Sequence, residues 1–299
     1  MNSAKLVKRY RVADLEKFRL ADVSPDDRGG LGLDKEGAQD LLVKDIRRLS
    51  ELQERLYAEH RWSLLVIFQA MDAAGKDSVI KHVMSGINPQ GCIVTAFKAP
   101  SAEELDHDFL WRAARALPER GRIGIFNRSY YEEVLVVRVH REILEAQKLP
   151  PKLVTNRIWR ERFKDIRAFE RHLARNGTVV LKFFLHVSKE EQKQRFLARL
   201  DDPAKRWKFS MSDIEDRKLW DRYLTAYEEM VRHTGTAHSP WHVVPADHKW
   251  FTHLVVAATM IAALERLDLK FPGVKGKARK EMKRVRKALL AEPSAAAKP

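Results

Sequence analysis

Five short apolar segments, separated by longer segments of helical character, limit the folds open to this chain. The apolar segments are residues 64–68, 92–97, 122–126, 178–187 and 241–244. They are apolar over most of their length rather than at every second residue, as in strands that are covered on both faces. Strands that alternate with helices form a parallel sheet between two helical layers, so we expect a three-layer α/β/α fold around five parallel strands. Ligands in such folds bind at the carboxyl ends of the strands.

The segments between the apolar runs carry helical periodicity and helix-start signals. The periodicity predicts helices over residues 36–59, 76–85, 156–175 and 250–267. A serine followed three residues later by glutamate is the spacing of a capping box. It predicts three more helix starts, at Ser101 with Glu104, Ser188 with Glu191, and Ser212 with Glu215. We expect the first of these helices to continue to about residue 117.

Composition narrows the class of protein further. The chain has 299 residues, 44% hydrophobic and 32% charged, which is within reach of one large α/β domain. The longest apolar run, residues 254–264, is too short to cross a bilayer, and the N-terminus lacks the apolar core of a secretory signal. Cys92 is the only cysteine, which excludes internal disulfides, and we expect a buried, unreactive thiol there. These features predict a cytoplasmic protein that does not span a membrane.

A net charge of +15 indicates either a polyanionic partner or a fold that tolerates the repulsion between its cations. Nucleic acid, an anionic membrane and a phosphorylated substrate all meet that need. Part of the surplus lies in residues 270–299, which we interpret as a basic tail. Such a tail is a solvated, partly helical extension, a polyanion-binding segment or part of an interface between subunits.

The loop after the first apolar segment is an incomplete phosphate loop. Residues 68–77 read FQAMDAAGKD, whereas the usual pattern is G-x-x-x-x-G-K-[ST]. Ala70 replaces the first glycine, and Asp77 replaces the hydroxyl residue that holds magnesium. Lys76 still supplies a charge for a phosphoryl group, and Asp72 offers magnesium a carboxylate within the loop. The backbone of Ala73, Ala74, Gly75, Lys76 and Asp77 is then the candidate phosphate cradle. A chance match to the loop pattern remains the alternative.

A second candidate element follows the third apolar segment, in FNRSYYEEVLVVRVH. A phosphate-loop enzyme usually carries an aspartate at the end of such a strand, but here Asn127 stands in its place. Arg128 lies at the strand tip, where a guanidinium is able to grip phosphate oxygens. Glu132 and Glu133 follow within two turns and offer the missing negative charge. Alternatively, Arg128 is an ordinary surface residue at the start of a helix.

A third candidate element is a cationic lid at about residues 188–215. Arg195 and Arg199 are four residues apart and share one helix face. Lys205 and Lys208 follow after a break at Pro203. Mobile cationic lids close over phosphates in phosphoryl-transfer enzymes, although an ordinary solvated helix face has the same pattern.

Together these segments resemble the family-2 polyphosphate kinases. The matching segments are MDAAGKD, INPQGCIVTAFKAPSAEELDHDFLWR, FNRSYYEEVLVVRVH, FFLHVSKEEQKQRFLARLDDPAKRWKFSMSDIEDRKLWDRYLTAYEEM and PWHVVPADHKWF, over residues 35–268. The resemblance implies a thymidylate-kinase-like P-loop fold with a helical lid. It also implies reversible phosphoryl transfer between inorganic polyphosphate and nucleotides, AMP or ADP giving ADP or ATP, with Mg²⁺ or Mn²⁺ as cofactor. The implied partners are polyphosphate and the nucleotides AMP, ADP and ATP, with GDP and GTP as further candidates. Nucleic acid and membranes are not among them, and the expected assembly is a homodimer or homotetramer.

The resemblance also assigns site residues. It makes Asp72 the magnesium ligand and Gly75 and Lys76 phosphate binders. It makes Arg128 a phosphate contact, with Asn127 marking a subgroup that phosphorylates both mono- and diphosphates. In that subgroup Glu132 or Glu133 takes the missing acidic role, and Glu133 becomes a second candidate metal ligand. The remaining assignments are Arg138, Arg195, Arg199, Lys205 and Lys208 to polyphosphate, and Asn88, Lys98 and Glu132 to the nucleotide.

These expectations divide the chain into an N-terminal arm (1–35), a P-loop kinase domain (36–269) and the basic tail (270–299). Two other functions remain open. One is an ATP-dependent nucleotide kinase on the same fold. The broken phosphate loop and the high cation density fit a polymer donor better than a single ATP molecule. The other is a nucleic-acid-binding protein on a kinase-like fold, which predicts tight oligonucleotide binding without turnover.

Overall fold

A five-stranded parallel sheet forms the centre of the computed structural model, which describes residues 3–30, 32 and 35–292. The strands are β1 (Ser63–Ala70), β2 (Cys92–Ala96), β3 (Ile123–Asn127), β4 (Thr178–His186) and β5 (Trp241–Pro245). Their order in the sheet is β2-β3-β1-β4-β5, and every pairing is parallel. All eight residues of β1 are buried, because this central strand is covered on both faces. The predicted sheet is therefore confirmed.

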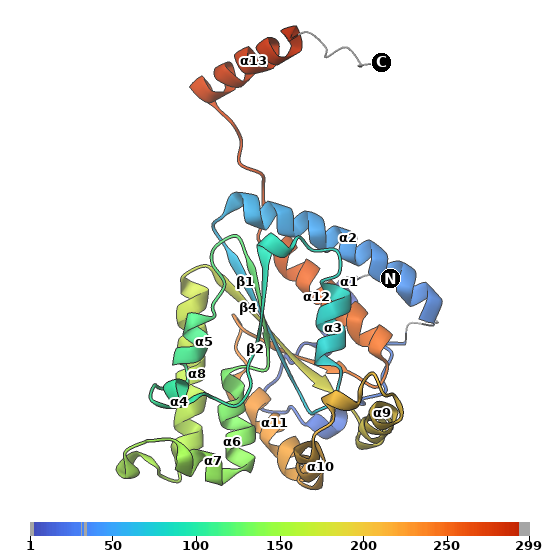
Figure 1. Cartoon of the computed structure of the whole chain (residues 1–299), viewed down its shortest axis with the longest axis vertical. Coiled ribbons are helices and arrows are strands. Elements are labelled where there is room, and N and C mark those ends of the chain that lie inside the picture. Colours follow the sequence, from blue (N-terminus) through green and yellow to red (C-terminus); the bar gives the residue numbers. More distant parts are fainter. Residues whose placement is uncertain (1–2, 31, 33–34, 293–299) are drawn as a thin grey trace.

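Helices cover both faces of the sheet and complete the three layers (Figure 1). One layer contains α2 (Lys35–Glu59), α3 (Lys76–Val83) and α12 (Lys249–Glu265). The other contains α5 (Trp111–Arg115) and α8 (Ile158–Arg175), and α11 (Trp220–Thr234) packs against α8. Short helices α6 (Val136–Val139) and α7 (Arg141–Ala146) follow β3. One continuous hydrophobic core fills the space on both sides of the strands.

Two expectations about helix starts need correction. The segment after Ser101 is two short helices, α4 (Ala102–Leu105) and α5, rather than one helix to residue 117. The capping box of Ser101 forms as predicted, but the Asp108 side chain accepts the Leu110 N–H at 2.9 Å and interrupts the helix. Helix α10 (Met211–Lys218) begins after Ser210, whose hydroxyl accepts the Ser212 N–H at 3.3 Å. The predicted Ser188 cap of α9 (Lys189–Asp201) is confirmed.

The N-terminal segment packs onto the domain. Helix α1 (Ser3–Tyr10) buries Leu6 and Tyr10, and the Tyr10 ring meets Phe251 of α12 edge-on. The chain then runs beside β5, where Arg11 forms an antiparallel bridge with His242. This contact explains why the edge strand β5 is buried along its whole length.

The C-terminal helix α13 (Gly276–Ala291) stands away from the domain, and all of its side chains are exposed (Figure 1). Helices long and apolar enough to cross a membrane are absent from the described part of the chain. Cys92, at the start of β2, is half-buried, and this burial raises the pKa of its thiol to about 11.

Candidate active site

The incomplete phosphate loop lies between the carboxyl end of β1 and the first turn of α3. Gly75 and Ala73 adopt left-handed backbone conformations, with φ of 110° and 62°. A side chain at Gly75 would have room, since its nearest neighbour would be Arg195 at 3.7 Å, so glycine is needed there for its backbone conformation. Within residues 35–292, the N–H groups of Gly75, Lys76 and Asp77 have no protein acceptor. The loop thus presents free donors at a helix start, as a phosphate site requires.

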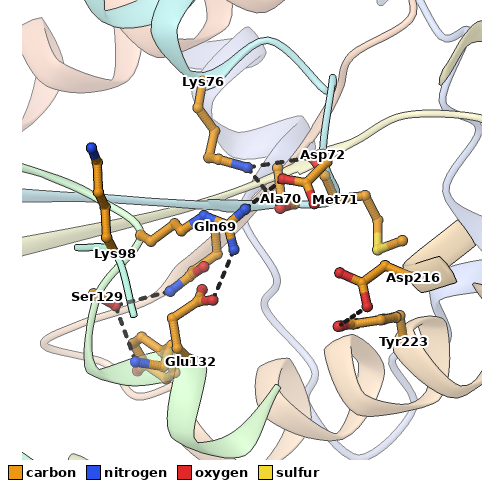
Figure 2. A network of polar contacts seen from close by, with 12 residues as sticks. Gln69, Ala70, Met71, Asp72, Lys76, Lys98, Ser129, Glu132, Asp216 and Tyr223 are labelled. Atoms are coloured by element: carbon orange, nitrogen blue, oxygen red, sulfur yellow. Dashed lines mark hydrogen bonds and ion pairs between the residues drawn. The ribbon is translucent and has the colours of Figure 1, made fainter. Parts of the chain in front are cut away.

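Lys76 lies buried within this loop. Its ammonium donates to the carbonyl oxygens of Ala70 at 2.8 Å and Met71 at 3.3 Å (Figure 2). Burial, followed by the positive charge of Arg128, lowers the pKa of Lys76 to about 8. A bound polyanion would supply the negative charge that this buried ammonium lacks.

Arg128 joins the two predicted motifs. It occupies the tip of β3 with a left-handed φ of 64°, and its N–H donates to the Phe68 carbonyl at 3.0 Å. Its guanidinium donates to Asp72 at 2.5 Å and to Glu132 at 3.0 Å. These carboxylates, Glu132 first, raise the pKa of Arg128 above its ordinary value. The strained backbone and the two ion pairs hold one cation directly beside the phosphate loop.

The two departures from the usual pattern, Asp77 and Asn127, contact each other. The Asn127 amide donates to Asp77 Oδ1 at 2.8 Å, and the ammonium of Lys208 lies 3.6 Å from Asp77 Oδ2. An aspartate at position 127 would bring two carboxylates together in place of this hydrogen bond. Asparagine at the tip of β3 is therefore compatible with Asp77 at the start of α3.

The cations of the predicted lid segment differ in burial and in their contacts. Arg195 is buried, and its guanidinium donates to the carbonyl oxygens of Ala73, Ala74, Ala246 and Asp247 at 2.6–3.1 Å. Gln192 of the same helix donates to the Asp72 carbonyl at 2.9 Å. Arg199, one turn later, is partly exposed, and its nearest acid is Asp213 at 3.9 Å. Lys205 is exposed and pairs with Asp202. Arg195 thus braces the loop, whereas Arg199 remains accessible to a ligand.

Helices α10 and α11 bring residues to the site that sequence reasoning missed. Burial and then the charge of Asp72 raise the pKa of Asp213 to about 6. Asp216 accepts hydrogen bonds from His140 at 2.7 Å and from the Tyr223 hydroxyl at 3.1 Å (Figure 2). Asp213 and Asp216 lie about 140 positions beyond the loop, and their only sequence signal is that they belong to the three acids of SMSDIEDRK.

Three predicted residues do not join the loop. Glu133 is buried and pairs with Arg162 of α8, facing away from its neighbour Glu132. Arg138 pairs with Glu229 of α11 at 2.5 Å. Asn88 lies before the amino end of β2, at the opposite edge of the sheet, where its side chain accepts the Gln90 N–H. Lys98, by contrast, follows the carboxyl end of β2 and shares the edge that carries the site (Figure 2).

A buried polar network supports the segment after Arg128. Glu170 of α8 accepts hydrogen bonds from Tyr130 at 2.9 Å, Tyr131 at 2.6 Å and Ser239 at 2.7 Å, and pairs with Lys182 of β4 at 2.7 Å. Glu170 and Lys182 are completely buried. Because Tyr130 and Tyr131 lie two and three residues after Arg128, the network fixes the backbone that presents the guanidinium.

A cavity of about 310 Å³ opens beside Glu133, which belongs to this segment. Its lining includes Phe109, Arg112, Glu133, Lys148 and Arg162. Arg112 also donates to the Lys98 carbonyl at 2.8 Å, so the cavity adjoins the carboxyl end of β2. In residues 3–30, 32 and 35–292, groups of three or more side chains placed to hold a metal ion are absent.

Comparison with known proteins gives consistent matches. A family model described as Polyphosphate kinase 2 (PPK2) matches residues 32–272. An ADP-polyphosphate phosphotransferase of Rhodopseudomonas palustris is 51% identical over 284 residues, which are 95% of this chain and 98% of the relative. An AMP/ADP-polyphosphate phosphotransferase of Meiothermus ruber is 46% identical, over 89% of this chain and 96% of the relative. The crystal structure of a polyphosphate kinase 2 from Arthrobacter aurescens superposes with a TM-score of 0.86 at 40% identity, covering 94% and 96% of the two chains.

Proposed function

This chain belongs to the polyphosphate kinase 2 family, and from that premise we propose that it transfers a phosphoryl group between inorganic polyphosphate and a nucleoside mono- or diphosphate. The observation that carries the proposal is the meeting of Lys76, Asp72 and Arg128 at one edge of the sheet. N–H groups without a protein acceptor, a buried ammonium and a guanidinium therefore occur together at the phosphate loop. Positioning and charge neutralisation are the main demands of phosphoryl transfer, and these groups supply both.

A polymer is the donor that best fits the cations that extend beyond the phosphate loop. Lys208 reaches the start of α3, and Arg199 is partly exposed on the lid helix. A single nucleotide triphosphate would need fewer cations than a chain whose phosphates continue past the transferred group. The net charge of +15 fits the same donor.

A divalent cation fits the residues at the loop. Asp72 presents a partly exposed carboxylate beside the free N–H groups, at the position where substrate phosphates would complete the ligand set. Mg²⁺ and Mn²⁺ bind in this way, through one or two carboxylates together with phosphates and water. The cation would neutralise charge on the phosphoryl group. Glu132 is the nearest additional carboxylate, whereas Glu133 is committed to Arg162.

Residues of the chain itself bind the phosphates and hold the loop in place during the reaction. Substrate phosphates compete with Asp72 for the Arg128 guanidinium, which keeps its contact with Glu132, and the Asp72 carboxylate would then be available to hold the cation. Lys76 leaves its two carbonyl partners and contacts the transferred phosphoryl group. Gln192 and Arg195 hold the loop carbonyls fixed during transfer. Alignment of donor and acceptor and neutralisation of their charge are the main contributions expected from such a site.

The acceptor nucleotide enters from the side of β2. Lys98 lies at the carboxyl end of that strand and is placed to contact the acceptor phosphates. The adjoining cavity, with Phe109 and Arg112 in its lining, has the size and the mixed lining for a nucleoside. We propose both AMP and ADP as acceptors, in agreement with Asn127 at the tip of β3.

The deciding experiment combines the protein with polyphosphate, magnesium and either AMP or ADP. Formation of ADP and ATP, respectively, is the expected result. Asp72→Asn should abolish turnover with little change in melting temperature, because Asp72 is partly exposed and its loss removes a metal ligand. Absence of product with both acceptors, together with tight oligonucleotide binding, would replace this proposal by the nucleic-acid-binding alternative.

A further inference from the structure

More than half of the net charge lies in one-tenth of the chain. Residues 270–299 contain ten lysines and arginines and two glutamates, which is +8 of the total +15. Helix α13 alone carries seven cations and one acid: Lys277, Arg279, Lys280, Lys283, Arg284, Arg286 and Lys287, with Glu281. At 100° per residue the cations occupy one half of the helix surface. Ala278, Met282, Val285 and Leu289 share the opposite side.

These cations have no partner within the described part of the chain. None of the seven forms an ion pair in residues 35–292, and every side chain of α13 is exposed. Like charges on one short helix repel each other, which is costly unless a polyanion neutralises them. The match to the family model ends at residue 272, so the helix lies outside the part that defines the catalytic domain.

We propose that α13 is a second polyphosphate-binding element, which holds long chains while one end reacts at the phosphate loop. The inference rests on the proposed function, because it takes polyphosphate as the donor. A cationic face about 24 Å long, at 1.5 Å per residue, is able to neutralise a run of successive phosphates and release their counterions. An anionic membrane suits the helix less well, because its apolar side has no aromatic residue to anchor in lipid.

The position of α13 makes the effect depend on chain length. In Figure 1 the helix projects from one end of the domain, and the lid helices α9 and α10 lie at the other. A short oligophosphate is unable to reach both, whereas a long chain bound at α13 has its free segments concentrated near the catalytic site. Such tethering raises effective concentration without changing the chemical step.

The test compares two variants with the intact chain, using long-chain polyphosphate and a short oligophosphate as donors. One variant ends at Phe271, and the other replaces Lys280, Lys283, Arg284 and Lys287 by glutamine. For long chains we expect KM to rise on the order of tenfold with kcat unchanged, and the salt dependence of KM to weaken. For the short donor we expect no change in either constant.

A matched control replaces Met282 and Leu289 by serine, which removes the apolar side and keeps the charge. This control should leave KM for long chains unchanged. The inference is overturned if both variants retain the KM of the intact chain for long polyphosphate, or if KM for short and long donors rises equally. Binding of the intact chain to anionic vesicles, with KM unaffected by the glutamine variant, would also overturn it in favour of a membrane role. Failure of the proposed function is distinct, since the intact chain would then use neither donor.

Discussion

Replacing Arg195 by methionine should both destabilise the protein and slow its reaction. The same change at Arg199 should have a smaller effect on stability and on rate. The two arginines are one helical turn apart, and sequence alone assigns both to phosphate. In the structure Arg195 makes five hydrogen bonds, to Glu191 at 2.8 Å and to four backbone carbonyls at 2.6–3.1 Å. Arg199 has one loose contact, at 3.9 Å from Asp213.

The size of the effect follows from burial. The Arg195 side chain is 7% exposed, and methionine fills similar space without donating to any of the five acceptors. Removing one partner of a buried charged arrangement costs about 3–5 kcal/mol of the free energy of unfolding. Arg199 is 3.9 Å from Asp213, and such a loose, partly exposed ion pair contributes about 0–1 kcal/mol. Because Ala73 and Ala74 would lose their anchor, a loop displacement of about 1 Å should lower kcat roughly 100-fold.

The assay is urea unfolding of both variants together with kcat and KM for polyphosphate. Arg195→Met should lose stability and kcat, and Arg195→Lys should lose part of each, since one ammonium reaches fewer carbonyls. Arg199→Met should keep the stability of the parent and raise KM for polyphosphate. Equal stability of the two methionine variants, or a selective rise in KM for Arg195→Met, would refute the division of roles between them.

Three further changes test other parts of the site. Because burial lowers the pKa of Lys76 to about 8, kcat/KM for polyphosphate should fall above pH 8 as the ammonium loses its proton. A bound polyanion should shift the corresponding fall in kcat to higher pH. A kcat/KM profile that stays flat well beyond pH 8 contradicts this role of Lys76. The unliganded protein should gain stability between pH 8 and 10.5, where the unfolded chain still binds a proton on this lysine, and Lys76→Met should lack the gain in pH-dependent unfolding. Glu170→Gln leaves Lys182 buried without a counter-charge and should lower the free energy of unfolding in urea by about 3–5 kcal/mol. Adding Lys182→Met should restore part of this loss. A double variant no more stable than Glu170→Gln would argue against charge as the cause. Gly75→Ala introduces strain at φ of 110° and should cost about 1–3 kcal/mol with loss of kcat, whereas unchanged melting would mean that the loop adopts another conformation.

Much of the fold was predictable because its signals are local. Continuous apolar runs placed β1 and β4 within one or two residues of their observed ends, and the caps at Ser101 and Ser188 depend on side chains three residues apart. The predictions failed where two local signals competed. Asp108 ended a helix that periodicity would have continued, and Ser210 took the capping position expected for Ser212.

The candidate site was predictable in part. Lys76 and Arg128 each follow an apolar strand, and parallel strands bring their carboxyl ends to one edge. The direction in which each side chain points was harder to predict from the sequence. Glu132 and Glu133 are adjacent in sequence, yet one faces Arg128 and the other faces Arg162. Asn88 belongs to a matching segment but lies at the amino end of β2, at the edge of the sheet opposite the phosphate loop.

The sequence by itself determined which segments are strands, where the phosphate loop lies and how much positive charge the chain carries, because these depend on residues close together in the chain. Only the tertiary structure decided which charges meet. It paired Asp72 with Arg128, joined Asn127 to Asp77, and brought Asp213 from the lid to the loop. It also buried Arg195 against backbone carbonyls while leaving Arg199 accessible. The physical reason is that a charged side chain takes the partner that burial and packing place within about 3 Å, and its own neighbours in sequence do not specify that partner.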